Sequence, residues 1–345
     1  MTENKFNIKD TILAVDINEA TQAVKENRFK DAIKLLEINL IEHPDHIDSL
    51  YLAGVCSRYL KEFDDAIKYI ESLLVHAPDM GRAYQELAHI NRDMGNEEKS
   101  ISNYRQACEL NPALISSWMS LYEYFKKNNN KPALDHATEQ INKLKSLPNM
   151  LLYIDQVMNE GRLGVAELKC REFLKKNPTH TYAMSQLSEI ANRLGHFDDA
   201  ELLLEKAVQF NPDDGELRMK YALVLRKKQK FAKTMEQVNI LCDKYPDNLA
   251  YQAQKASEIM QNGQHEDAID LFDDILSKNP HNFSTFTSKG HALKTLGKTD
   301  DAIESYQSAY KIRPDHGEAF FSLANLKTYS FSNPELMNMK EQIKR

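Results

Sequence analysis

The side chains that could carry chemistry are spread along the 345 residues without the spacing that catalysis or metal binding requires. None of the 11 histidines belongs to an HExxH pair or stands beside a cysteine at zinc-ligand spacing. His43 and His46 are three residues apart, but both belong to the polar turn EHPDHID. The four cysteines form no CxxC pair, which is typical of reduced thiols in the cytoplasm. They are Cys56, Cys108, Cys170 and Cys242. We expect no metal site.

Pairs of aspartates recur at one position of the repeated pattern, and paired carboxylates are a feature of general acid–base catalysis. They are Asp64–Asp65, Asp198–Asp199 and Asp300–Asp301. Each pair opens a predicted helix, as a cap or in the first turn, where the helix dipole favours negative charge, so the pairs are not catalytic dyads. No Walker loop, GxGxxG or GxSxG motif is present. We therefore predict that this chain is not an enzyme and holds no cofactor.

Composition limits the class of protein. Hydrophobic residues make up 42% and charged residues 28%, and the mean hydropathy is −0.57. Such a chain is too hydrophobic for disorder, and it lacks the run of about 18 apolar residues that a membrane helix needs. The first residues do not resemble a signal peptide. A net charge of −7 disfavours nucleic acid as a partner. We expect a helix-rich cytoplasmic protein.

Regularly spaced prolines reveal an internal repeat. Pro44, Pro78 and Pro112 are 34 residues apart, and the same interval separates the prolines from Pro178 to Pro314. This period is typical of a unit of two helices joined by a turn. With the proline at position 32, the units are 13–46, 47–80, 81–114, 115–146, 147–180, 181–214, 215–248, 249–282 and 283–316. A segment 1–12 precedes this array, and 317–345 follows as a partial unit with capping helices.

Small residues recur at positions 8 and 20 of the units. The two antiparallel helices of a unit are expected to cross there, because they can approach closely only where the side chains are small. Large apolar residues recur at position 24. Two units depart from this pattern, because position 8 holds Tyr122 in one and Ile154 in the next, and unit 115–146 is two residues short. We expect a weak joint at 115–180, although compensated packing is an alternative.

Glycine often occupies position 15, as Gly95 and Gly297 do, where a helix end needs a left-handed residue. The strings GHFDDAELLLEKAVQFNPDD (195–214) and GKTDDAIESYQSAYKIRPDH (297–316) carry the second half of the unit. From about residue 13 to 328 the chain resembles the tetratricopeptide-repeat (TPR) family. The resemblance implies an all-α, right-handed superhelical solenoid of antiparallel helix pairs, with nine full units, a partial tenth and a concave groove.

The first helix of each unit is expected to line that groove. Its position 6 lacks both the Lys/Asn/Arg carboxylate clamp of chaperone-binding TPR domains and the asparagine ladder of O-GlcNAc transferase. Position 12 is basic in five units, and position 6 offers further hydrogen-bonding groups. The candidate peptide groove is Arg58, Arg92, Lys126, Gln186, Lys220, Arg226, Gln254 and Lys294. These residues predict an acidic, extended peptide or protein as partner. Alternatively, the basic residues merely complement the helix dipole. Oligomeric state stays open.

The C-terminal string EAFFSLANLKTYSFSNPELMNMKEQI departs from the repeat, and Asn333 is expected to cap a new helix with Pro334 at its first position. The string is similar to the junction in bacterial proteins that fuse a TPR array to a sulfotransferase domain. That resemblance implies a protein-binding scaffold that recruits the substrate or partner of a sulfotransferase. The cofactor 3′-phosphoadenosine-5′-phosphosulfate would then belong to a domain beyond Arg345. The alternative is a free-standing cytoplasmic TPR adaptor without enzymatic relation.

Overall fold

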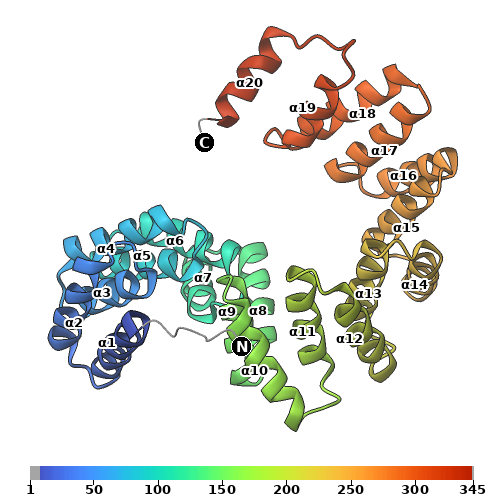
Figure 1. The fold of residues 1–345 in the computed structure, drawn as a ribbon. Coiled ribbons are helices and arrows are strands. Elements are labelled where there is room, and N and C mark those ends of the chain that lie inside the picture. Colours follow the sequence, from blue (N-terminus) through green and yellow to red (C-terminus); the bar gives the residue numbers. More distant parts are fainter. Residues whose placement is uncertain (1–7, 344–345) are drawn as a thin grey trace. The chain divides into compact units, whose positions relative to one another are not determined.

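The structure is a computed structural model that describes residues 8–343, which contain 20 α-helices and no strand. The helices follow one another as antiparallel pairs (Figure 1). The chain divides into two compact units, residues 1–177 and 178–345, and each is described by itself. The fold is therefore all-α, as the 34-residue period predicts.

The first unit holds ten helices. They are α1 (Ile8–Lys25), α2 (Phe29–Glu42), α3 (Ile47–Tyr59), α4 (Phe63–His76), α5 (Gly81–Asp93), α6 (Glu97–Leu110), α7 (Ile115–Lys127), α8 (Lys131–Lys145), α9 (Asn149–Asn159) and α10 (Leu163–Lys176).

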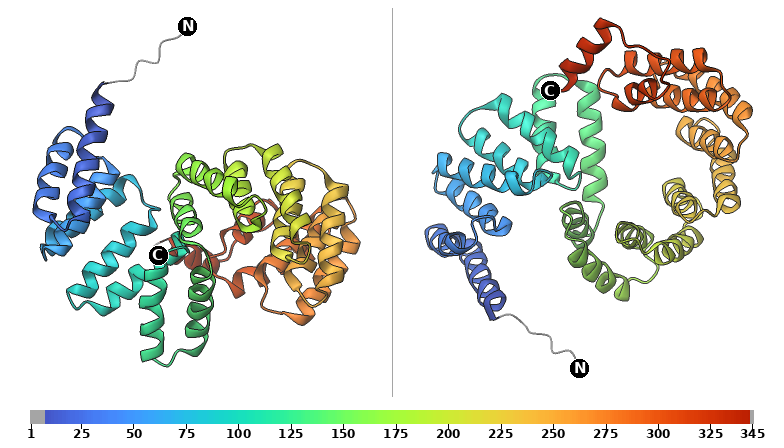
Figure 2. Two further views of the ribbon diagram at one scale, coloured as in Figure 1. Left: turned by 90° about the horizontal axis from the view of Figure 1, so that it is seen from below. Right: turned by 45° about the horizontal axis from the view of Figure 1, so that its top comes forward.

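The second unit holds the other ten. They are α11 (Thr181–Arg193), α12 (Phe197–Phe210), α13 (Gly215–Lys227), α14 (Phe231–Lys244), α15 (Leu249–Gln261), α16 (His265–Lys278), α17 (Phe283–Thr295), α18 (Thr299–Ile312), α19 (Gly317–Ala324) and α20 (Asn333–Ile343). Figure 2 shows the paired helices of each unit from two further directions.

Polar residues at the last position of a repeat start the first helix of the next one. The Asp214 carboxylate accepts a hydrogen bond from the Leu217 backbone N–H at 3.0 Å, and Asn282 does the same for Thr285 at 3.1 Å. These side chains satisfy N–H groups that have no partner inside the helix. The aspartate pairs lie in the first turns of the second helices, as predicted, but they are not the caps: Asp64 follows Phe63, and the N-cap residue is Glu62.

The two helices of a repeat cross where position 8 is small. A methyl group added to Gly54 would come within 2.5 Å of Ile70 Cδ1, at position 24 of the same repeat. In repeat 147–180 the sizes are exchanged, because Ile154 stands at position 8 and Cys170 at position 24, and both are fully buried. The bulky residue at position 8 is thus matched by a smaller residue at position 24. This agrees with the alternative expectation for this repeat, that compensating changes in packing accommodate the bulky residue.

Repeat 115–146 solves the same problem differently. The buried residues of α4 are Ala66, Ile70 and Leu73, whereas those of α8 are Ala137, Ile141 and Leu144. The spacing is the same, but α8 is displaced by three residues in the repeat numbering. Tyr122 remains only half-buried beside this core. Because of this displacement, the residues of α8 that pack in the core are not those that would lie opposite Tyr122 in a regular repeat. Tyr122 therefore does not obstruct the crossing of α7 and α8.

Stacking between repeats is interrupted inside the first unit. The second helix of a repeat packs on the first helix of the next at α2–α3, α4–α5 and α6–α7, but α8 has no comparable contact with α9 among the described residues. Helix α9 instead contacts the loop that follows α6. The Asn111 side chain donates to the Gln156 carbonyl at 3.2 Å, and the Gln156 side chain donates to the Ala113 carbonyl at 3.1 Å. The irregularity expected at 115–180 therefore lies between α8 and α9.

The first helices of the repeats line the inner face, as expected. Helix α3 contacts both α1 and α5, and α15 contacts α17, whereas no two second helices of the described chain touch to the same extent. First helices are thus closer together than second helices, which places them on the inside of the curve. No helix in residues 8–343 combines the length and apolar character needed to cross a membrane.

The C-terminal helix starts at the register of a second repeat helix but does not pair with α19 in the usual way. Its N-cap is Ser332 and not Asn333, because the Leu336 N–H donates to the Ser332 carbonyl at 3.1 Å. The Glu335 carboxylate in turn accepts from the Ser332 backbone N–H at 2.7 Å. The bond from the Ser332 N–H to Glu335 is the acidic half of a capping box, and Pro334 is second in the helix.

Candidate functional site

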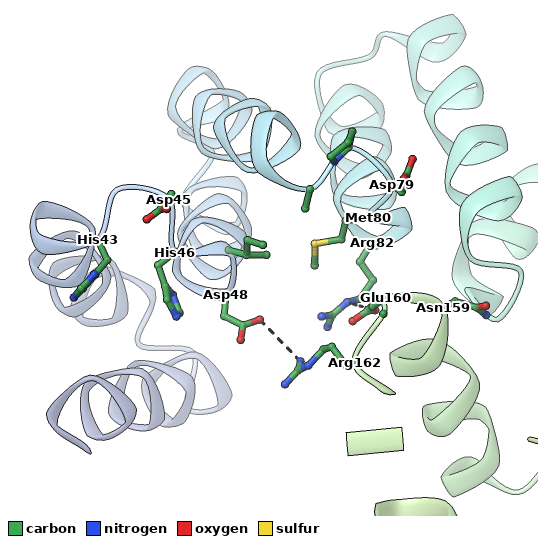
Figure 3. Close-up of a pocket in the computed structure, with 14 residues that line it drawn as sticks. His43, Asp45, His46, Asp48, Asp79, Met80, Arg82, Asn159, Glu160 and Arg162 are labelled. Carbon is green, nitrogen blue, oxygen red and sulfur yellow. Dashed lines mark ion pairs between the residues drawn. The ribbon is translucent and has the colours of Figure 1, made fainter. Parts of the chain in front are cut away.

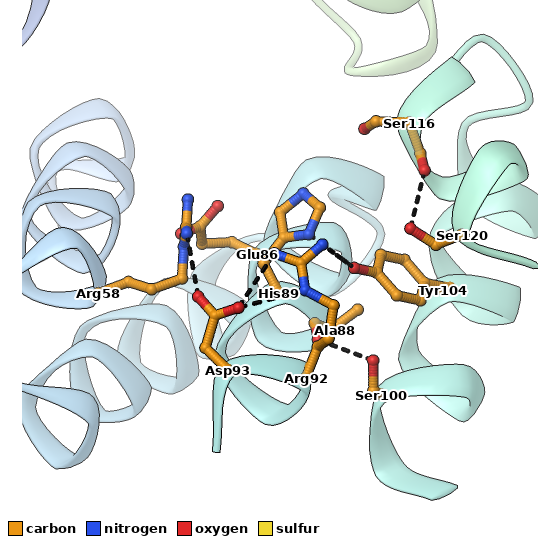
Figure 4. A network of polar contacts seen from close by, with 10 residues as sticks. All are labelled: Arg58, Glu86, Ala88, His89, Arg92, Asp93, Ser100, Tyr104, Ser116 and Ser120. Carbon is orange, nitrogen blue, oxygen red and sulfur yellow. Dashed lines mark hydrogen bonds and ion pairs between the residues drawn. The ribbon is translucent and has the colours of Figure 1, made fainter. Parts of the chain in front are cut away.

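The first-unit part of the candidate groove begins with a buried arginine. The Arg58 side chain is 11% exposed, and its guanidinium pairs with Glu86, whose side chain is 5% exposed, and with Asp93 (Figure 4). It also stacks 4.4 Å from the centre of the Tyr59 ring. Burial raises the pKa of Glu86, although Arg58 opposes this. Arg58 is therefore engaged within the chain and offers little to a ligand.

Arg92 belongs to the same network and is more open. Its guanidinium pairs with Asp93 at 3.0 Å and donates to the Tyr104 hydroxyl at 3.3 Å, and about half of the side chain is exposed. The His89 ring also bonds to that hydroxyl, at 2.7 Å. Burial lowers the pKa of His89 to about 4, and the nearby arginines add to the effect, so this ring is neutral at pH 7. Figure 4 shows these groups converging from one repeat.

Lys126 lies outside that network. Its side chain is exposed, and its Nζ is 5.9 Å from the centre of the Tyr122 ring. The structure thus brings Arg58 and Arg92 together around Asp93. Of the first-unit candidates, Lys126 and part of Arg92 are open to solvent.

The second-unit residues form a partly connected set. Lys220 Nζ is 3.1 Å from Ser185 Oγ and 3.2 Å from the Glu216 carboxylate. Arg226 pairs at 3.3 Å with Glu258, whose side chain is 2% exposed, and the Gln254 amide donates to the same carboxylate at 2.6 Å. The Arg226–Glu258 pair joins α13 to α15 and so stabilises the stack of repeats, whereas the bond from Gln254 lies within α15 and holds Glu258 in place.

The two remaining candidates differ in exposure. Gln186 is 4% exposed, so it is largely hidden within α11. Lys294 is exposed in the last turn of α17, where a cation complements the helix dipole. The dipole interpretation accounts for Lys294 without any ligand.

A cavity of about 600 Å³ opens on the inner face of the second unit. It is lined mainly by α11, α13 and the turn before α14, with single residues from α12, α14 and α15. Three cations line it, Lys220, Arg226 and Lys227, against one carboxylate, Glu189. Its volume lies within the range of about 300–1,000 Å³ that is usual for ligand sites. An unequal charge of this kind favours an anionic ligand.

Apolar residues complete this cavity and were not among the sequence candidates. Leu223 and Phe231 both line it, and each is just over 40% exposed. Lys227 Nζ donates to the Asn192 side-chain oxygen at 2.9 Å and lies 5.8 Å from the Phe197 ring. Phe231 is the first residue of α14 and follows the turn between the two helices of its repeat.

Comparison with known families supports the repeat assignment. Models of the tetratricopeptide repeat match residues 17–80 and 81–114, and the model of the Psidin N-terminal TPR repeat region matches residues 224–340. Within the described chain, no group of three or more His, Cys, Asp or Glu residues could hold a metal ion.

Two curated relatives are distant. The chain is 22% identical over 236 residues to the DnaJ homolog subfamily C member 7 homolog of Dictyostelium discoideum, covering 66% of this chain and 39% of that protein. It is 22% identical over 148 residues to the human protein O-mannosyl-transferase TMTC1, covering 42% of this chain and 17% of that protein. The chain therefore matches well under half the length of either relative.

Solved structures of similar fold include YrrB, described as a TPR protein with an unusual peptide-binding site, and MamA. YrrB is 17% identical, with a TM-score of 0.42 over 54% of this chain and 96% of YrrB. MamA is 16% identical, with a TM-score of 0.42 over 48% of this chain and 96% of MamA. With repeat models matching three separate stretches and helix pairs recurring every 34 residues, the chain belongs to the tetratricopeptide-repeat family, as a scaffold suited to protein binding.

Proposed function

We propose that the second unit binds an acidic, extended segment of a protein partner on its inner face. The observation that supports this proposal is the cavity with three cations and one carboxylate. It lies on the helices that face inward, where successive repeats present side chains to an extended ligand. In this proposal the chain is a binding scaffold and performs no chemistry of its own.

Two lysines are the principal contacts. Lys227 bonds to the neutral side chain of Asn192, which is readily exchanged for a ligand carboxylate. Lys220 bonds to Ser185 and also pairs with the exposed Glu216 carboxylate at 3.2 Å, so a ligand competes with Glu216 there. Arg226 is neutralised by the buried Glu258, so the positive charge available to a ligand comes from the two lysines. Leu223 and Phe231 would accept an aliphatic or aromatic side chain beside the acidic one. We expect the preferred segment to combine acidic and apolar residues.

The other sequence candidates have smaller roles in this proposal. Arg92 and Lys126 extend the basic surface of the first unit, and Lys294 that of the second. Each exposed ion pair contributes only about 0.2–1 kcal/mol, so recognition needs several such contacts together. Gln186, Gln254 and Arg58 shape the inner face without offering open groups, since they are buried or paired within the chain.

The test is a binding titration of the full chain with a fluorescent peptide that alternates glutamate and leucine. We expect its affinity to fall with added salt and to exceed that of a glutamine-for-glutamate control peptide. The double variant Lys220→Glu/Lys227→Glu removes this preference. The matched variant Lys206→Glu/Lys233→Glu makes the same change in net charge at exposed sites on second helices and retains it. Equal binding of both peptides, independent of salt, would overturn the proposal.

A recruiting arm of a sulfotransferase is the more specific proposal, and it is supported only by the sequence of the junction at 317–345. A strand followed by a phosphate-binding loop carries the sulfate donor in such enzymes, and residues 8–343 contain no strand. We therefore assign no donor site to these residues and expect no binding of adenosine 3′,5′-bisphosphate by calorimetry. Reading the gene beyond the Arg345 codon distinguishes this proposal from a free-standing cytoplasmic adaptor.

A further inference from the structure

Three loops of the first unit enclose a second cavity, of about 710 Å³ (Figure 3). Two of them join consecutive repeats and contribute residues 43–48 and 77–82, and the third is the turn 159–162 after α9. The turn reaches this place because α9 docks on the loop after α6 and not on α8. The cavity is therefore a product of the irregular stacking, and a regular array would not form it.

The charge of this cavity is opposite to that of the second-unit cavity. Four carboxylates line it, from Asp45, Asp48, Asp79 and Glu160, against the two guanidinium groups of Arg82 and Arg162. His43 and His46 complete the polar lining. His46 is already engaged, because its Nδ1 accepts from the Ser49 N–H at the start of α3. An excess of carboxylates favours a cationic ligand.

Glu160 is the buried acid of the cavity. Its side chain is 3% exposed, and one oxygen lies 2.5 Å from Arg82 Nε. That ion pair compensates part of the cost of burying the carboxylate, and the other oxygen, Glu160 Oε2, has no hydrogen-bond partner among the described residues. Burial raises the pKa of Glu160, and Arg82 and Arg162 act in the opposite direction. Oε2 can therefore accept a hydrogen bond from a further donor.

The two arginines are held very differently. The Arg82 guanidinium pairs with Glu160 and also stacks 4.8 Å from the centre of the Tyr51 ring. Arg162 reaches Asp48 only at 4.0 Å, and both of these side chains are more than 40% exposed. Figure 3 shows this loose pair across the opening of the cavity. Arg162 is therefore a weak internal competitor for Asp48.

The apolar part of the lining suits a long aliphatic stem. Ile47 is 37% exposed, and Pro78 and Met80 lie in the adjacent loop. Lysine and arginine commonly lay their methylene groups on apolar surface while the charged head reaches polar partners. A cavity with carboxylates at Asp48 and Glu160 and apolar residues beside them offers both kinds of contact.

We propose that this cavity receives a lysine or arginine side chain from a protein partner. The cationic head binds the Asp48 and Glu160 carboxylates, and the stem packs on Ile47 and Pro78. Binding displaces Arg162 from Asp48 into solvent. This site is separate from the proposed acidic-peptide site: it lies in the other unit, uses none of the same residues and selects the opposite charge.

The sign of one variant tests the proposal. The probe is a fluorescent alanine–serine peptide with two lysines and blocked ends, titrated against the full chain, with a glutamate peptide of equal length as its counterpart. Arg162→Gln removes the internal competitor, so we expect the lysine peptide to bind more tightly. Asp48→Asn removes a carboxylate, and we expect about a fivefold loss, the size that one partly exposed ion pair supports.

A matched variant separates the site from general attraction to an acidic protein. Asp65→Asn makes the same charge change at an exposed position on α4 and should leave the affinity unchanged. Circular dichroism confirms that each variant is folded. Weaker lysine-peptide binding by Arg162→Gln, or equal losses from Asp48→Asn and Asp65→Asn, would overturn the proposal. Tighter binding of the glutamate peptide that depends on Arg162 would instead indicate an anion site. None of these outcomes depends on the second-unit lysines.

Discussion

Gly290 lies directly against the ring of Tyr306, and a methyl group added to Gly290 would come within 2.5 Å of the Tyr306 Cε1 atom. The ring is fully buried, and its hydroxyl is fixed at 2.9 Å from His291 Nδ1. The same histidine–tyrosine pair occurs six repeats earlier, as His89 and Tyr104. A small residue at position 8 thus makes room for a large side chain at position 24.

Replacing Gly290 with alanine is therefore expected to destabilise the repeat 283–316. Overpacking of this kind costs about 1–3 kcal/mol, and the better helix propensity of alanine offsets up to about 1 kcal/mol of that. Urea denaturation of the full chain and hydrogen exchange in α17 and α18 measure the effect. The control is Gly317→Ala at the start of α19, where an added methyl group meets no atom within 4 Å. Equal stability of the two variants would contradict the close contact.

The sequence predicted the helix pairs because their cause is local and repeated. Proline spacing and small residues at position 8 recur in most units, and the turn between the two helices has a left-handed residue, as at Gly95 and Gly297 with φ of 82° and 74°. The three-residue displacement of α8 was not predicted, because it follows from how Ala137 and Ile141 pack. An alignment that gives every repeat the same numbering cannot show such a displacement. The pairing of Ile154 with Cys170 was not predicted either, because it depends on positions 8 and 24 changing together in one repeat.

Asn111 is the central contact between α9 and the rest of the first unit. It is fully buried, donates to the Gln156 carbonyl at 3.2 Å, and accepts from the Ala113 N–H at 3.2 Å. Replacing it with alanine leaves these buried groups without partners, a cost of about 1–3 kcal/mol. We expect faster hydrogen exchange in residues 149–162, so that the segment 115–180 opens before its flanks.

The repeat provides a control for this change. Asn211 occupies the same position in unit 181–214, is only half-buried, and has no side-chain hydrogen bond among those described. Asn211→Ala is therefore expected to change exchange in its own unit by much less. If exchange is uniform along the wild-type chain and unaffected by Asn111→Ala, α9 is not a weak joint.

The sequence revealed the basic residues at position 12 of the repeats, but it did not show which of them are free to contact a ligand. Arg58 is neutralised by Glu86 and Arg226 by Glu258, and each acid belongs to the following repeat. Glu86 is at position 6 of its repeat and Glu258 is at position 10. The two arginines share position 12, but their acidic partners share no position, so the repeat pattern did not reveal the pairs. The first-unit cavity was missed for the same reason, since Asp48 and Arg162 come together only through the docking of α9.

The cysteines differ in reactivity because of burial. Burial raises the pKa of Cys56 and of Cys108 to about 12, and both side chains are almost completely enclosed. Cys242 is half-buried, and its pKa is raised less clearly. Because the thiolate is the reacting form, we expect iodoacetamide at pH 8 to label Cys242 first. Peptide mass spectrometry after timed labelling checks the order, and equal rates at Cys56 and Cys242 would show that the first unit opens readily.

Glu335 anchors the last helix through its carboxylate. Burial alone would raise its pKa, but hydrogen bonds from the hydroxyls of Tyr310 and Tyr329 and from Ser332 outweigh burial and lower it to about 2. A carboxylate with a lowered pKa stabilises the folded state above its ordinary pKa of about 4.5, and the contribution is lost as pH falls towards 2. We therefore expect α20 to detach from α18 during acidification, before the remaining helices of the second unit open.

Hydrogen exchange in residues 333–343, corrected for the intrinsic pH dependence of amide exchange, measures this release. Glu335→Gln removes the ionised acceptor, and since charge-assisted hydrogen bonds contribute about 1.5–3 kcal/mol, α20 should already exchange rapidly at pH 7. Its protection should then vary little between pH 7 and pH 3. Glu341→Gln, at an exposed position of the same helix, is expected to keep the wild-type profile. Parallel profiles for the wild type and Glu335→Gln would mean that the apolar contacts of Phe331 and Met339 hold α20 in place without the carboxylate.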